Sequence, residues 1–275
     1  MTYENTPTQS IDVNGTSFAY REAGTKGGVP LVLLHHLTAV LDDWDPAVVD
    51  GLAASHHVIA FDNRGVGGSG GTTPPSVEAM AQDAIAFIRA LGLDKVDLLG
   101  FSLGGFVAQV VAQAEPELVR KIIIAGSGPA GGEGLSNMGA VLQDAVAKAS
   151  AVGKHPKHFL FFSQTDKGQA AANAFLARLA KRTEDRDVAI GNASIHAQLT
   201  AIDAWGRAAP APLGEIAHPV LVVNGDDDVM APTIYSFELA RRLPDAQLSI
   251  FPDAGHGSIF QYHTEFVRQA LEFLR

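Results

Sequence analysis

Short apolar runs alternate with amphipathic segments along most of this 275-residue chain. The apolar runs are nearly uninterrupted, which is typical of strands that helices cover on both faces. The segments between them repeat apolar residues at helical spacing. The predicted strands are 30–34, 58–61, 96–99, 122–125, 220–223 and 248–251, and the predicted helices are 77–91, 103–114, 234–243 and 265–274. This alternation predicts an α/β fold with a mostly parallel sheet and helices on both faces.

The first part of the chain follows a different pattern. Between residues 11 and 22, two alternating runs flank Asn14-Gly15, which is the strongest short signal for a tight hairpin turn. We therefore expect antiparallel strands at one edge of the sheet.

A second departure lies between residues 128 and 218, where no run is typical of a buried strand. Helix-like segments at 139–149, 170–181 and 189–200 lie between a glycine-rich loop and a Pro-Ala-Pro segment. We predict an α/β core of residues 1–128 and 216–275 and a helical cap of residues 129–215. Helical excursions at the carboxyl edge of a sheet often form lids; a helical subdomain with only a packing role is the alternative.

Composition narrows the choice of partners. The net charge of −10 disfavours binding to nucleic acid or to an anionic membrane. The chain has no cysteine, which excludes disulfides, a cysteine nucleophile and a thiolate metal site. The polar first ten residues do not resemble a secretory signal, and no apolar run is long enough to span a membrane. We expect a cytoplasmic protein that acts on a small molecule; its oligomeric state stays open.

The candidate chemistry centres on Ser102, in the Gly-x-Ser-x-Gly stretch 100–104 between a predicted strand and a predicted helix. A serine on such a turn points its hydroxyl out of the sheet, beside the N-terminus of the helix. It needs a base to take its proton and a carboxylate to orient that base. Two later strands lead into the acidic run 226–228 and into His256, so a carboxylate and a histidine follow in the order Ser, Asp, His.

These motifs resemble those of the α/β-hydrolase fold, and the resemblance covers nearly the whole chain. It is strongest to small esterases, lactonases and cofactor-free haloperoxidases (perhydrolases). The family's acid usually stands three residues after a glycine that closes a strand, which selects Asp228 after Gly225 over Asp226. Its histidine follows a glycine, as His256 does, and its Asp-x-Arg-Gly-x-Gly-x-Ser loop matches residues 62–69.

The resemblance implies hydrolysis of a carboxylic ester or lactone through an acyl-enzyme on Ser102, with no cofactor and no metal. The N–H groups of Leu37 and Leu103 would form the oxyanion hole. His36 stands where the family usually has glycine, so we expect unusual backbone angles there. Its side chain would narrow the pocket, hydrogen-bond the substrate or simply pack in the loop.

Several apolar side chains are candidates for an acyl pocket, although core packing is the simpler interpretation of each one. With His36, the candidate pocket residues are Trp44, Met138, Phe159, Phe162 and Trp205. The same triad supports peracid formation by a haloperoxidase or perhydrolase, and C–C bond hydrolysis. A ligand-sensing protein that keeps the triad but turns over slowly is an alternative of another class.

Overall fold

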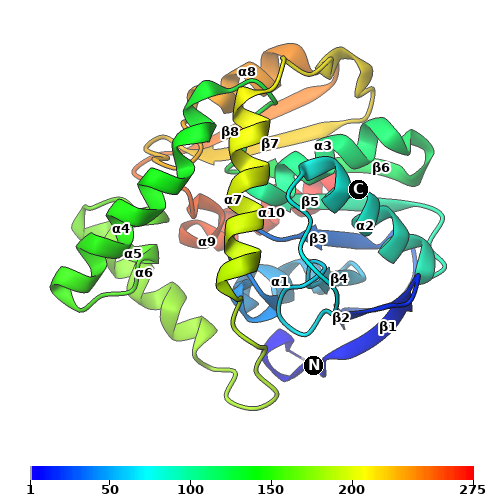
Figure 1. The fold of residues 1–275 in the computed structure, drawn as a ribbon, viewed down its shortest axis with the longest axis horizontal. Helices are drawn as coiled ribbons and strands as arrows, with labels where there is room; N and C mark the ends of the chain where they lie inside the picture. Colours follow the sequence, from blue (N-terminus) through cyan, green and yellow to red (C-terminus); the bar gives the residue numbers. More distant parts are fainter. Residues whose placement is uncertain (1) are drawn as a thin grey trace.

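One sheet of eight strands forms the centre of the molecule, in the order β1-β2-β4-β3-β5-β6-β7-β8. The strands are β1 (Gln9–Val13), β2 (Thr16–Ala23), β3 (Leu31–Leu34), β4 (Val58–Phe61), β5 (Val96–Phe101), β6 (Val119–Ala125), β7 (Val220–Gly225) and β8 (Ala246–Phe251). The computed structural model describes residues 2–275. The pairings β1·β2 and β2·β4 are antiparallel and all the others are parallel, which confirms the predicted α/β sheet (Figure 1).

The antiparallel edge is the predicted hairpin. Asn14 and Gly15 both have positive φ, 53° and 83°, as the favoured two-residue hairpin turn requires. Val13 pairs with Thr16 across this turn, so the turn sets the register of the two strands. In the middle of the sheet, β3, β4, β5 and β7 are buried at every residue, which explains their unbroken apolar runs.

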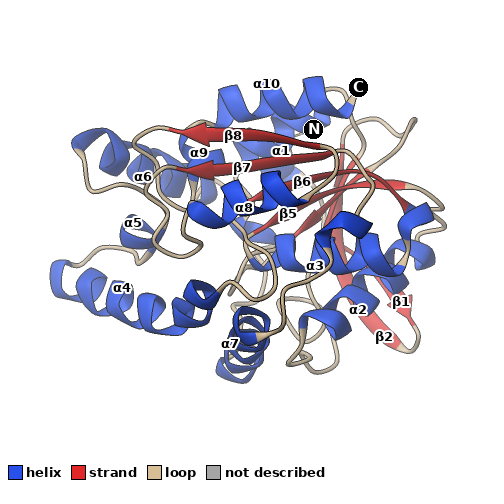
Figure 2. Cartoon of the chain, turned by 90° about the horizontal axis from the view of Figure 1, so that it is seen from above, coloured by secondary structure: helices blue, strands red, loops and turns tan. Residues whose placement is uncertain are grey.

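Helices cover both faces of the sheet (Figure 2). Helices α1 (Pro46–Ala53) and α10 (His263–Leu274) lie on one face, and α2 (Val77–Ala90), α3 (Leu103–Ala114) and α8 (Ile234–Arg242) lie on the other. The four-residue helix α9 (Ser258–Gln261) precedes α10. Short 3-10 helices span Tyr3–Asn5, Leu41–Asp43, Pro116–Leu118, Glu133–Asn137 and Leu213–Glu215. The helices predicted at 77–91, 103–114, 234–243 and 265–274 are confirmed to within about a turn.

A helical region is inserted between β6 and β7, as expected. It contains α4 (Met138–Val152), α5 (Lys157–Leu160), α6 (Asp166–Leu179) and α7 (Asn192–Arg207). These helices lie beyond the carboxyl ends of the parallel strands (Figures 1 and 2). We call this region the cap and keep its boundaries, 129–215, as a proposal. No helix within residues 2–275 is both long and apolar enough to cross a bilayer.

Candidate active site

Ser102 occupies the sharp turn between β5 and α3. Its backbone angles are φ 57° and ψ −117°, a sparsely populated conformation for a residue with a side chain. The turn is held by two hydrogen bonds: the Ser102 N–H donates to the Ala125 carbonyl of β6 at 2.9 Å, and the Ser127 hydroxyl donates to the Ser102 carbonyl at 2.9 Å. The Ser102 hydroxyl is buried and has no hydrogen-bond partner within residues 2–275.

The glycines of the motif are required because the turn brings backbones into contact. A Cβ on Gly104 would lie 2.1 Å from the Leu34 carbonyl oxygen, and one on Gly100 would lie 2.3 Å from the Gly104 carbonyl oxygen. Neither neighbour is a flexible side chain that can move aside. The Gly-x-Ser-x-Gly spacing therefore allows α3 to start directly against β3 and β5.

Asp228 and His256 meet at the same edge of the sheet, from the loops that follow β7 and β8. The His256 Nδ1–H donates to Asp228 Oδ2 at 2.8 Å. The other carboxylate oxygen, Asp228 Oδ1, accepts from the N–H groups of Met230 at 2.8 Å and Ala231 at 2.9 Å. This bond fixes the imidazole with its proton on Nδ1, which leaves a lone pair on Nε2, a buried atom that has no partner within residues 2–275.

The neighbouring carboxylate favoured less by the sequence is exposed. The Asp226 Oδ1 accepts from the N–H of Ala254, in the loop after β8, at 3.2 Å. The structure thus brings Asp228, and not Asp226, to His256.

The loop after β3 carries the unusual backbone angles, but not at the expected residue. Thr38 has φ 68°, whereas His36 does not have a positive φ. A positive φ is a marked outlier for a β-branched residue. The Thr38 N–H donates to Gln198 Oε1 of α7 at 2.8 Å, so the cap helps to hold this conformation. The expectation for His36 was wrong because the chain turns two residues later.

Leu37 and Leu103 are the two residues whose N–H groups are predicted to form the oxyanion hole. Leu37 lines the same cavity as Ser102. Leu103 is the first residue of α3, and N–H groups in the first turn of a helix have no partner inside that helix. Their roles as oxyanion donors stay a proposal.

His36 lies between two aromatic rings beside this loop. Its ring contacts Phe101 and Phe161 edge to face, with centroid distances of 5.2 Å to each. Those two rings also contact His256, at 5.0 Å and 5.6 Å. Burial, and then the positive charge of Lys157, lower the pKa of His36 to about 3, so its ring is neutral at ordinary pH.

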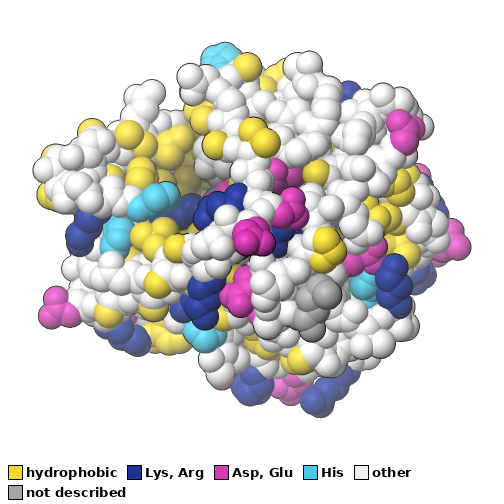
Figure 3. Space-filling model, turned by 90° about the horizontal axis from the view of Figure 1, so that it is seen from below, with side chains coloured by type: hydrophobic (Ala, Val, Ile, Leu, Met, Phe, Trp, Pro, Cys, Tyr) yellow, Lys and Arg dark blue, Asp and Glu magenta, His cyan; other side chains and the backbone are white. Residues whose placement is uncertain are grey.

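A cavity of about 280 Å³ lies between the core and the cap. Figure 3 shows hydrophobic side chains gathered in a hollow on this side of the molecule, with histidine and basic side chains nearby. Its lining is mostly apolar, and sites for small molecules typically start at about this size. The lining residues are His36, Leu37, Thr38, Ser102, Leu142, Val146, His155, Pro156, Lys157, Leu160, Phe161, Ile195, Met230 and His256.

Of the six candidate pocket residues, only His36 lines this cavity. Trp205 instead stacks on Phe106 and donates its indole N–H to the Gly128 carbonyl at 3.3 Å. The remaining candidates, Trp44, Met138, Phe159 and Phe162, also lie outside the lining. The aromatic candidates pack in or against the core rather than around the cavity, because burying a large aromatic side chain removes the most apolar surface from water. The residues that the sequence missed include Leu142 and Val146, an i, i+4 pair on the predicted helix 139–149.

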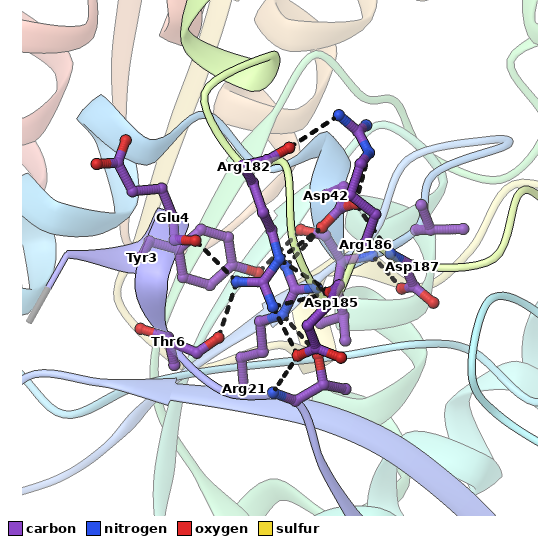
Figure 4. Close-up of polar contacts among 12 residues, drawn as sticks. Tyr3, Glu4, Thr6, Arg21, Asp42, Arg182, Asp185, Arg186 and Asp187 are labelled. Carbon is purple, nitrogen blue, oxygen red and sulfur yellow. Dashed lines mark hydrogen bonds and ion pairs between the residues drawn. The ribbon is translucent and has the colours of Figure 1, made fainter.

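Ion pairs tie the cap to the core near the oxyanion loop (Figure 4). Asp42 is a buried residue in the segment that follows β3. Its carboxylate pairs with Arg21 of β2 at 2.7 Å and accepts a hydrogen bond from the Asp187 N–H of the cap at 2.9 Å. Arg182 and Arg186 of the cap each lie 3.5 Å from the same carboxylate. We call these five residues the cap anchor. Among residues 2–275, no group of three or more His, Asp or Glu side chains is arranged to hold a metal ion.

The Asp62 side chain lies beside the cap anchor and organises the 62–69 loop. Its two oxygens accept from the Leu41 and Gly68 N–H groups, both at 3.0 Å. Burial, and then the hydrogen bond and negative charge of the Asp187 carboxylate, raise the pKa of Asp62 well above its ordinary value. This loop therefore has a structural role. In a dinucleotide-binding loop the glycines lead directly into a helix, whereas after the glycines of this loop the next helix, α2, begins only at Val77.

The fold and this arrangement of strand-end residues match a known family. The family model for the alpha/beta hydrolase fold matches residues 29–261, most of the chain. This chain belongs to the α/β-hydrolase fold family. An α/β-hydrolase fold protein from Chitinophaga pinensis has a solved structure with a TM-score of 0.93 and 45% identity, covering 100% of this chain and 99% of that one.

Other members of the family share lower identity with this α/β-hydrolase. The dihydrolipoyllysine-residue acetyltransferase component of the acetoin cleaving system of Pseudomonas putida is 30% identical over 97% of this chain and 69% of its own length. The 2-hydroxy-6-oxo-6-phenylhexa-2,4-dienoate hydrolase of Burkholderia cepacia is 29% identical over 81% of this chain and 78% of its own length. The relatives as a group include esterases, lactonases, bromoperoxidases and C–C hydrolases.

Proposed function

We propose that this α/β-hydrolase cleaves a carboxylic ester or lactone through an acyl-enzyme on Ser102. The observation that carries the proposal is the 2.8 Å hydrogen bond between His256 and Asp228, at the cavity that Ser102 also lines. It leaves His256 Nε2 free to accept a proton, which is what a serine nucleophile requires.

In the proposed reaction, His256 Nε2 takes the proton of Ser102 as Oγ attacks the substrate carbonyl carbon. The carbonyl electron pair moves onto oxygen, and the N–H groups of Leu37 and Leu103 stabilise this oxyanion. When the carbonyl re-forms, the bond to the alkoxy oxygen breaks and His256 protonates the leaving alcohol. His256 then deprotonates a water molecule that attacks the acyl-enzyme, which releases the acid and restores Ser102.

The shape and lining of the cavity support a small, largely apolar substrate. Its volume of about 280 Å³ is near the lower end for small-molecule sites. Leu142 and Val146 of α4 and Ile195 of α7 supply apolar surface from the cap. We propose that the cap acts as a lid and sets which acyl group reaches Ser102.

The proposal is tested by active-site titration with a fluorophosphonate, followed by turnover of a panel of p-nitrophenyl esters and lactones. Native protein should be labelled once per chain, and Ser102→Ala should not be labelled. Ser258→Ala is the matched control, because Ser258 is a second buried serine whose hydroxyl has no partner within residues 2–275. Labelling that persists in Ser102→Ala, or that is lost in Ser258→Ala, refutes the assignment.

Turnover separates this proposal from its alternatives. Ester hydrolysis predicts many turnovers in water alone. Activity that requires hydrogen peroxide supports a perhydrolase or haloperoxidase, and cleavage restricted to C–C bonds supports a C–C hydrolase. A single turnover followed by arrest, with ligand-dependent binding of a partner, supports a sensor.

A further inference from the structure

Three of the residues that line the cavity carry a buried side-chain N or O atom with no partner within residues 2–275. They are Ser102 Oγ, His256 Nε2 and His36 Nε2. The proposed mechanism uses the first two atoms and gives the third no role. A buried polar atom without a partner costs free energy, so its retention at a reaction site needs an explanation.

The chemical state of the His36 ring follows from its other nitrogen. Nδ1 lies 2.7 Å from the Leu37 carbonyl oxygen. A carbonyl oxygen can only accept, so Nδ1 carries the hydrogen in this contact. The ring is 95% buried against Phe101 and Phe161, which disfavours a second proton. Nε2 therefore holds a free lone pair and can act only as an acceptor.

The position of this acceptor relates it to the reacting carbonyl. His36 directly precedes Leu37, whose N–H is proposed to bind the oxyanion. Its ring and that of His256 contact the same two aromatic rings, Phe101 and Phe161. His36, Leu37 and Ser102 line the same cavity, so a substrate bound there also faces the part of the wall that His36 forms.

We propose that His36 is a specificity-determining residue, whose Nε2 accepts a hydrogen bond from a hydroxyl or amide N–H that the substrate carries next to its reacting carbonyl. This inference rests on the proposed function. It narrows the substrate class to hydroxy or acylamino esters and lactones. A substrate without the donor leaves the Nε2 lone pair without a hydrogen bond inside the closed site. A site that hydrogen-bonds a donor on its substrate therefore rejects an analogue that lacks this donor.

The test compares substrates that differ only in the donor. Methyl butyrate is measured against its α-hydroxy and β-hydroxy counterparts, and γ-butyrolactone against its α-acylamino counterpart, by titration of the released acid. The hydroxyl pair and the amide pair identify which donor the site takes. In the native enzyme, at least one donor-bearing substrate should have a kcat/KM about tenfold above that of its partner.

Variants of His36 assign the preference to this ring. His36→Phe keeps a ring between Phe101 and Phe161 but has no acceptor, so the ratio of the two kcat/KM values should fall towards one. His36→Gln places an amide oxygen near the position of Nε2 and should restore part of the ratio. Val146→Ala, the control, changes the lining of the cavity without changing its acceptors and should keep the ratio. Thermal unfolding shows that each variant is folded.

The outcomes separate the inference from the proposed function. Hydrolysis of these esters with no donor preference, or with a preference that survives in His36→Phe, overturns the role of His36 and leaves Ser102 catalysis intact. If the native enzyme hydrolyses none of them and none of the p-nitrophenyl esters and lactones of the panel, the proposed function fails. The inference is then decided by calorimetric binding of the intact substrates to Ser102→Ala. A donor-bearing compound should bind about tenfold more tightly than its partner, and Ser102→Ala/His36→Phe should abolish that difference; equal affinities in Ser102→Ala overturn the inference.

Discussion

The Asp228→Asn substitution tests the tautomer argument most directly. In the native protein, Asp228 Oδ1 is held by two backbone N–H donors at 2.8 and 2.9 Å, while Oδ2 faces His256. An asparagine must leave its amide oxygen on the two N–H donors, because its NH₂ group would oppose them. The NH₂ group then faces His256 Nδ1, which can remain bonded only as an acceptor.

This change moves the imidazole proton to the wrong nitrogen. With the hydrogen on Nε2, His256 cannot take the proton of Ser102. In serine hydrolases with this arrangement, the same substitution lowers kcat by about 10⁴, equivalent to about 5.5 kcal/mol of transition-state stabilisation. We expect a loss of this size here, with little change in KM, because the substituted side chain lies behind His256 rather than in the cavity lining.

The assay is steady-state hydrolysis of the best ester from the panel, with the rate of fluorophosphonate labelling as a second reading of Ser102. Asp226→Asn is the control: this exposed neighbour keeps an oxygen for the Ala254 N–H, and its kcat should stay within about twofold. A folded Asp228→Asn protein that keeps more than about a tenth of native kcat refutes the tautomer argument.

Three further changes probe the supports of the site. Gly104→Ala places a Cβ 2.1 Å from a backbone oxygen of β3 and should lower the free energy of unfolding in urea by about 3 kcal/mol or more. Gln198→Leu removes the acceptor of the Thr38 N–H and should cost about 1–3 kcal/mol of stability, with kcat falling more than KM changes. Asp187→Asn removes the charge beside Asp62, whose pKa is raised in the folded state. Since a raised carboxyl pKa makes stability fall as pH rises above about 4, the variant should gain stability relative to native protein between pH 5 and pH 8.

Controls make these three results specific. Gly139→Ala adds a Cβ in α4 whose nearest neighbour is 3.8 Å away, so it should not destabilise; equal losses for the two glycines would contradict the packing argument. Unchanged kcat in Gln198→Leu would mean that the Thr38 conformation does not depend on the cap. Asp144→Asn, on the exposed face of α4, should show no trend with pH relative to native protein, unlike Asp187→Asn.

The sheet and the long helices could be predicted because their signal is local and repeated. The four-residue helices α5 and α9 could not, since they are too short to show a repeat. Helix α1 lies outside the predicted helices for another reason: Asp45 and Pro46 form a start signal, but the eight residues of the helix make only about two turns of apolar repeat.

The residues of the candidate site also differ in whether a local sequence signal predicts them. Ser102, Asp228 and His256 follow strands, so their places in the chain carried the prediction, and the structure brings the last two together. The contact between Thr38 and Gln198 joins residues 160 positions apart and has no local signature. The cavity lining was also hidden, because a sequence pattern shows which residues are apolar but not whether they face a void or the core.

The hydrogen bond from Thr38 to Gln198 has a consequence for building new enzymes on this scaffold. A helix of the cap holds a strained residue in the loop proposed to bind the oxyanion, so the cap contributes to more than substrate choice. Grafting a cap from another member of the family would change the proposed reaction centre as well as the entrance. A chimaera that preserves this pair and the cap anchor should retain a working core, whereas one that exchanges the cap alone inherits an unsupported loop.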